Sequence, residues 1–265
     1  MIGRRYLPGV PQSSDSDPRR DSLLRRIGDV YFQVFHTYRA WWMYILPLAA
    51  VVLIPLEVIN SVAEHGIDSL ETTRWLEAVL LASVTGAISS SSLLGQVFIA
   101  GAIGLSLTHA RNGKPPRIAW MVRNIRFLRL ITVDVLYVIV VLIGLLLLIV
   151  PGVAALIFFA LVGPAVELEN RGARKAFSRS FQLVRSDFWL VFWVLLLAEI
   201  VGFLLGESVA SLTRYILGEA TVVDGIAKGA SDVILDPLFA IAAAILAMRL
   251  LGLPAPFTSR GHRNT

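Results

Sequence analysis

Residues 164–189, PAVELENRGARKAFSRSFQLVRSDFW, separate two almost uninterrupted apolar runs. The stretch carries five basic residues: Arg171, Arg174, Lys175, Arg179 and Arg185. Five apolar residues recur at intervals of three or four, which gathers them on one face of a helix: Ala173, Ala176, Phe177, Phe181 and Val184. The pattern predicts an amphipathic helix at a membrane surface, with its apolar face toward the acyl chains and its basic face toward phosphates.

The composition is typical of a membrane protein. Of the 265 residues, 56% are hydrophobic and 16% are charged, and the mean hydropathy is +0.71. A soluble domain is rarely so apolar. The net charge is +5, and the absence of cysteine excludes disulfides and thiolate metal sites. The four histidines show no metal-ligand spacing: His36, His65, His109 and His262. We expect no cofactor, no metal and no nucleic acid partner.

Six segments are apolar and long enough to be candidate membrane spans, since about 20 residues cross the hydrocarbon core. They are residues 41–59, 92–108, 130–150, 153–168, 188–206 and 233–251. Pro47 and Pro55 are expected to kink the first span, and Pro151 with Gly152 predicts a tight turn between the third and fourth.

The predicted fold is therefore all-α: a polytopic membrane protein with six transmembrane helices and cytoplasmic basic amphipathic helices. We assign residues 1–22 to a disordered cytoplasmic tail, residues 23–252 to the membrane domain and residues 253–265 to a second cytoplasmic tail.

Basic residues alternate with the predicted spans. All but three of the 24 precede the first span, separate the second from the third or the fourth from the fifth, or follow the sixth. The three exceptions are Arg74, Arg214 and Lys228. Positive charge accumulates on the cytoplasmic side of membrane proteins. The bias therefore predicts a multi-pass protein of the cell (inner or plasma) membrane with both termini in the cytoplasm.

Two further basic stretches precede pairs of spans: SLLRRIGDVYFQVFHTYRAWW at 22–42 and PPRIAWMVRNIRFLRLI at 115–131. Basic residues near an anionic leaflet contribute about 1 kcal/mol each. We expect these helices to lie on the anionic inner leaflet. The predicted lipid headgroup contacts are Arg123, Arg126, Arg174, Lys175, Arg179 and Arg185.

Two ordered strings in residues 90–195 resemble a known family. They are LTHARNGKPPRIAWMVRN at 107–124 and LLLLIVPGVAALIFFALVGPAVELENRGARKAFSRSFQLVRSDFW at 145–189. Both are similar to the membrane domain linked to glycerophosphodiester phosphodiesterases and to the related YciC-like integral membrane proteins. The resemblance implies a helical membrane domain. It implies no activity, because the catalytic barrel found in some relatives is absent from the 13 residues after Gly252.

Glu199, in VLLLAEIVGFLL, lies near the middle of the fifth predicted span. An ionised carboxylate there costs at least about 2.5–3.5 kcal/mol on insertion scales, so a partner or a proton is expected. Three interpretations remain open: a functional carboxyl that contacts a proton or cation, a protonated structural acid bonded to Ser or Thr of the second span, and a local water defect. No Lys, Arg or His lies in the middle of a span to pair with Glu199.

Other polar and small residues have structural interpretations. Acids near the span ends are expected to be solvated or to cap helices: Glu57, Asp134 and Asp236. Glu167 and Glu169 are expected to pair with Arg171, Arg174 or Lys175. Small residues in and just before the second span predict either close helix packing or a broken helix lining a cavity: Ser89 to Ser92, Gly95, Gly101 and Gly104.

The chain shows no nucleophile elbow, phosphate loop or metal-ligand pair, so we do not expect an enzyme. The sequence favours a non-catalytic membrane protein that scaffolds or assists an envelope or lipid-related process. Its expected partners are membrane lipids and a membrane protein. The alternative is a small transporter or permease-like subunit that uses Glu199 inside the helix bundle.

Overall fold

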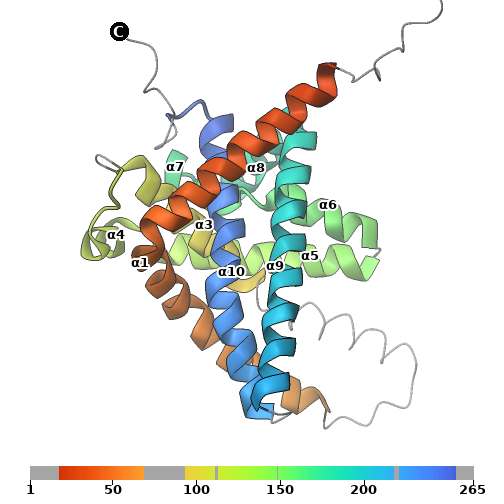
Figure 1. The fold of residues 1–265 in the computed structure, drawn as a ribbon. Helices are drawn as coiled ribbons and strands as arrows, with labels where there is room; N and C mark the ends of the chain where they lie inside the picture. The colour runs from red at the N-terminus through yellow and green to blue at the C-terminus, as the bar shows by residue number, and fades with distance from the viewer. Residues whose placement is uncertain (1–17, 69–92, 111–112, 148, 218–220, 255–265) are drawn as a thin grey trace, which may run out of the picture.

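The computed structural model describes the chain except residues 1–17, 69–92, 111–112, 148, 218–220 and 255–265 (Figure 1). Most of the predicted tails and the serine run 89–92 lie outside the described residues, as do the side chains around Glu57. The described residues form helices and no strand, which confirms the all-α prediction. The helices are α1 (Pro18–Asp68), α3 (Leu93–Thr108), α4 (Ile118–Asn124), α5 (Phe127–Leu147), α6 (Ile149–Phe159), α7 (Val162–Glu169), α8 (Ala173–Ser186), α9 (Phe188–Leu217) and α10 (Thr221–Leu250).

Five helical segments among the described residues are long and apolar enough to cross a membrane, as in a multi-pass membrane protein. They are Leu23–Pro55, Phe127–Leu145, Val150–Glu169, Phe188–Gly206 and Ala230–Leu250. Each overlaps one predicted span. The remaining predicted span, residues 92–108, corresponds to α3, which has 16 residues. At 1.5 Å per residue α3 is about 24 Å long, less than the roughly 30 Å of hydrocarbon.

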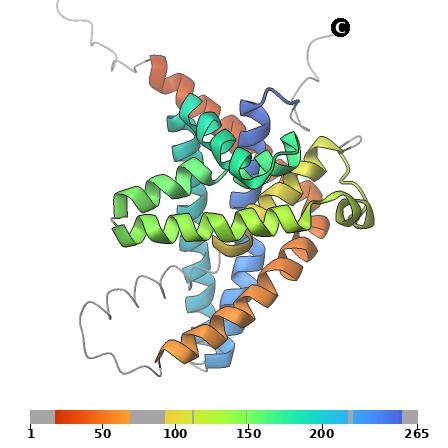
Figure 2. The ribbon, with the colours of Figure 1, turned by 180° about the vertical axis from the view of Figure 1, so that it is seen from behind.

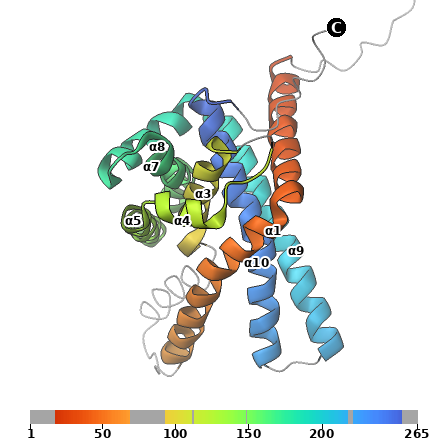
Figure 3. The same cartoon turned by 90° about the vertical axis from the view of Figure 1, so that its left-hand side faces the viewer.

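The long helices α1, α9 and α10 lie side by side (Figures 1 and 3). Tyr31 of α1 donates its hydroxyl to the Val194 carbonyl of α9 at 2.6 Å, and Tyr38 donates to the Ile234 carbonyl of α10 at 2.8 Å. The helix α1 begins at Pro18, within the segment predicted to be a disordered tail. Two prolines lie inside α1, as predicted, and the helix changes direction along its length (Figure 3).

The short helix α3 forms the centre of the fold. Residues 95–107 are all buried, and α1, α5, α7 and α10 pack around them. Gly101 and Gly163 allow α3 and α7 to touch backbone to backbone, because a Cβ added to Gly163 would lie 1.9 Å from the Val97 carbonyl oxygen. The glycine-rich α3 therefore serves close packing, as one of the two interpretations of its small residues predicts.

The helices α5 and α6 form a hairpin that runs across α9 and α10 (Figures 1 and 2). The hairpin closes on two glycines: a Cβ on Gly144 would lie 2.9 Å from the Gly152 Cα. The tight turn was predicted at residues 151–152, but these two residues lie in the first turn of α6. Proline is tolerated in a first helical turn because its missing N–H has no intrahelical partner there. The helix is then interrupted at Ala160 and Leu161, between α6 and α7, although the sequence stays apolar.

Candidate functional site

A group of polar side chains lies where α3 begins, surrounded by apolar helices. Gly95 has a φ of 94°, a left-handed conformation that glycine accepts without strain. Its N–H donates to Oδ2 of Asp134 on α5 at 2.7 Å. Asp134 is 5% exposed, so its carboxyl group is buried and caps the start of α3. Asp134 was predicted to be solvated or to cap a helix, and the structure shows the cap.

Glu199 reaches the same place from α9. The side-chain amide Nε2 of Gln96 donates to Glu199 Oε1 at 3.3 Å. One of the three interpretations placed Glu199 against Ser or Thr of the second span. Its partner does lie in that span, but it is Gln96. Gln96 is 2% exposed, whereas Glu199 is exposed on the surface of α9.

Tyr137 of α5 completes the group, which we call the polar cluster: Gln96, Asp134, Tyr137 and Glu199. The ring of Tyr137 is buried, and both carboxyl groups lie close enough to act on it electrostatically. Its hydroxyl donates to the Leu156 carbonyl at 3.4 Å, which is a long hydrogen bond. Sequence reasoning singled out Glu199 and missed Gln96 and Tyr137. A glutamine inside the apolar run LLGQVFIAG was the available signal.

The polar cluster has more acceptors than donors. Gln96 Oε1 and Asp134 Oδ1 are buried and have no hydrogen-bond partner among the described residues. The described part of the chain holds no group of three or more His, Asp or Glu side chains suited to a metal ion. Buried acceptors without donors are costly, so the cluster is suited to accept a proton or a cationic donor.

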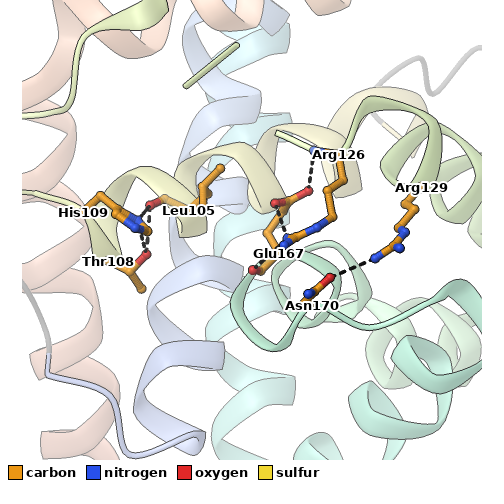
Figure 4. A network of polar contacts seen from close by, with 7 residues as sticks. All are labelled: Leu105, Thr108, His109, Arg126, Arg129, Glu167 and Asn170. Carbon is orange, nitrogen blue, oxygen red and sulfur yellow. Dashed lines mark hydrogen bonds and ion pairs between the residues drawn. The ribbon is translucent and has the colours of Figure 1, made fainter. Parts of the chain in front are cut away.

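At the other end of α3, an ion pair and several hydrogen bonds join the end of α7 to the start of α5 (Figure 4). Glu167 of α7 has a fully buried side chain, and its Oε1 accepts the backbone N–H of Arg126 at 3.0 Å. The Arg126 guanidinium donates to Glu167 Oε2 at 3.2 Å. Arg129 donates to the Asn170 side chain at 2.9 Å. Beside them, His109 Nδ1 lies 3.0 Å from the Leu105 carbonyl oxygen and closes the end of α3.

These contacts correct one of the two predicted pairings and confirm the other. Glu167 was expected to pair within its own stretch of sequence, but it pairs with Arg126. Glu169 does pair with Arg171, at 2.6 Å, and also with Arg179, at 3.0 Å. Arg126 and Arg179 were predicted to contact lipid headgroups, and the structure places both in ion pairs with carboxylates of the protein.

The amphipathic helix α8 is present as predicted, but its apolar face contacts protein. Ala176 and Val184 are buried, and α8 packs against α6 and α7. The Ser180 hydroxyl donates to the Phe158 carbonyl at 2.7 Å. The remaining predicted headgroup contacts are exposed: Arg123, Arg174, Lys175 and Arg185. At the end of α8, Asp187 forms an ion pair with Arg26 of α1.

No curated protein and no solved structure matches the chain. The resemblance to the membrane domain of glycerophosphodiester phosphodiesterases therefore stays a prediction. A family model described as a domain of unknown function, DUF7847, matches residues 64–253, more than two thirds of the chain. The chain thus belongs to the DUF7847 family.

Proposed function

We propose that this protein is a non-catalytic, multi-pass membrane protein that scaffolds or assists an envelope or lipid-related process. The observation that carries the proposal is the packing of α3. A buried helix, in backbone contact with α7 at Gly163, occupies the centre of the described bundle, where a transport pathway or a catalytic cleft would need open space. The surfaces that remain for function are the exposed basic residues and the exposed faces of the apolar helices.

The proposed topology has six crossings and both termini in the cytoplasm. The five candidate spans and the remaining predicted span, residues 92–108, supply an even number of crossings, as this orientation requires. The exposed basic residues Arg123, Arg174, Lys175 and Arg185 then contact anionic headgroups of the inner leaflet. The chain has no cysteine, so Ser178→Cys, on an exposed position of α8, provides one label site. A membrane-impermeant maleimide should react only from the cytoplasmic side; labelling from outside the cell would contradict the topology.

Extraction of the full chain into lipid nanodiscs from its native membrane tests the accessory role. Mass spectrometry of the particles should find one other membrane protein at a fixed ratio. Deletion of this chain from the cell should impair the process in which that protein takes part. Particles that contain only this chain and bulk lipid would contradict the proposal.

A permease-like subunit is the second candidate, and the polar cluster favours it. A helix that starts inside the bundle, next to the buried carboxyl group of Asp134, is an arrangement that transporters use to bind ions. In proteoliposomes with an internal pH dye, a potassium diffusion potential should then drive proton entry that Glu199→Gln abolishes and Glu169→Gln preserves. Absence of proton entry in the unmodified protein would exclude this candidate.

A further inference from the structure

The surface of α9 around Glu199 combines an exposed acid with open apolar surface. Glu199 lies inside the candidate span Phe188–Gly206 and is exposed. One turn further along, Gly202 has no atom within 4 Å of the position its Cβ would take, and Phe203 is 69% exposed. Residues three and four apart lie on the same side of a helix, so these three form one surface, the Glu199 face.

The Glu199 face lacks hydrogen-bond donors. Gln96 donates to Glu199 Oε1, while Oε2 receives no hydrogen bond from the described residues. Behind it, Gln96 Oε1 and Asp134 Oδ1 are buried acceptors without donors. A carboxylate at the surface of an apolar span is unfavourable in hydrocarbon. The complementary group is a cation with several N–H donors, such as the ammonium of lysine or the guanidinium of arginine.

The shape of the Glu199 face suits a second helix. Glycine on a membrane helix lets another backbone approach closely, and Gly202 is followed four residues later by Gly206. Gly206 is already used inside the protein, since its Cβ would lie 3.4 Å from Ser231 Oγ of α10. Gly202 has open space beside it, and exposed Phe203 can pack against the flank of an approaching helix.

We propose that the Glu199 face docks a transmembrane helix of another membrane protein that carries a lysine or arginine near its middle. The inference rests on the proposed accessory role and names the chemistry of the partner. The cation of the partner helix would pair with the Glu199 carboxylate, and Gly202 would let the two helix backbones approach closely. Lipid headgroup amines lie at the interface and do not reach the middle of a span.

A second copy of this chain does not provide that cation at the right depth. Among the basic residues in the described candidate spans, Arg39 lies farthest from the ends of its span, Leu23–Pro55. Arg39 is therefore the cation that a second copy would have to supply. Its neighbour Trp41 donates to the Gly113 carbonyl, beyond the end of α3, and Tyr44 bonds to Ser106 of α3. Glu199 bonds to Gln96, near the start of α3. Gln96 and Ser106 are about 15 Å apart along the axis of α3, by the helical rise.

A synthetic transmembrane peptide tests the proposal directly. The full chain and a leucine–alanine peptide with one central lysine are reconstituted into phosphatidylcholine vesicles, and association is measured by energy transfer between labels. Association should be about tenfold tighter than for the same peptide with central leucine. Glu199→Gln keeps an acceptor for Gln96 and should remove the difference, while Ile200→Ala, on the adjacent exposed position, should preserve it. Moving the lysine toward one end of the peptide should also remove the difference in affinity between the lysine and leucine peptides.

Equal binding of the lysine and leucine peptides to the unmodified chain would overturn the proposal. Tighter binding of the lysine peptide on Arg39→Gln, together with a change in oligomeric state, would overturn it in favour of self-association, because Arg39 of a second copy would then have occupied Glu199. A photoreactive residue in place of Phe203, which lies on the Glu199 face, then tests the docking face separately from the accessory role in the native membrane. Crosslinks to the partner from position 203 support the Glu199 face. A stoichiometric partner that crosslinks only from other faces would overturn this inference and leave the accessory role intact.

Discussion

Removal of the Glu167 carboxyl should destabilise the protein more than removal of any other acid on this side of α3. The Glu167 side chain is fully buried and accepts two hydrogen bonds, one from the Arg126 backbone N–H and one from the Arg126 guanidinium. The backbone N–H lies at the start of α5, so Glu167 also acts as a cap supplied by another helix. The perturbations are Glu167→Ala, which removes both contacts, and Glu167→Gln, which keeps an oxygen for the backbone N–H.

The magnitude follows from these contacts. Loss of a helix cap costs about 1 kcal/mol. Loss of the partner of the Arg126 guanidinium adds about 1–2 kcal/mol. This cost lies at the lower end of the range for unpaired charged groups, because the Arg126 side chain is 32% exposed. Glu167→Ala should therefore lower the free energy of unfolding by about 2–3 kcal/mol. Glu167→Gln should lower it by about 1 kcal/mol, because the cap remains and the charge is lost.

Thermal unfolding in nanodiscs, followed by tryptophan fluorescence, measures the effect. At roughly 2–4 °C for each kcal/mol, Glu167→Ala should lower Tm by about 5–10 °C. Glu169→Gln is the matched control, since its arginine partners are 30% and 38% exposed and such pairs contribute at most about 1 kcal/mol. A Glu167→Ala loss no larger than the Glu169→Gln loss would refute the assignment of Glu167 as a buried cap and ion-pair partner.

Three further changes test other parts of the structure. Gly163→Ala forces a Cβ to 1.9 Å from a backbone oxygen and should abolish folding or lower Tm by more than 10 °C. Gly28→Ala is the control: it lies at an exposed position inside α1 with open space around it, and it should leave Tm unchanged or raise it slightly. Asp134→Ala removes the cap of α3 and should cost about 1–2 kcal/mol, with faster hydrogen exchange at the start of α3; unchanged exchange there would contradict the cap. Replacing Arg174 and Lys175 by glutamine should reduce retention of phosphatidylglycerol in native mass spectrometry without lowering Tm, because both are exposed; a loss of stability instead would assign them to internal ion pairs.

Much of the fold was predictable because it depends on local properties of the sequence. Apolar runs of sufficient length predict helices wherever they occur, and five of the predicted spans overlap helices of the expected length. The three- and four-residue spacing in residues 173–184 predicts the amphipathic helix α8 for the same reason. The span count of six is not confirmed, because α3 is short and its apolar character serves burial among other helices.

The candidate site was only partly predictable. Glu199 could be identified because a single acid in an apolar run is conspicuous. Gln96 and Tyr137 could not be assigned to it, since they lie more than 60 residues away in the chain and approach Glu199 only in the folded structure. The same limit applies to Asp134, whose partner Gly95 is 39 residues distant.

The neighbouring acids Glu167 and Glu169 show what the sequence alone determined and what the tertiary structure decided. Sequence determined that an acidic helix end would precede a basic helix, and that opposite charges would pair. The two residues lie about 200° apart around α7, so they face different neighbours. Glu169 meets its own stretch at Arg171 and Arg179, whereas Glu167 turns inward to Arg126, 41 residues away. Local hydropathy and spacing determined which segments are helical. The rotation and crossing of those helices decided which charges are buried in pairs and which stay exposed, because that choice depends on contacts between segments distant in the chain.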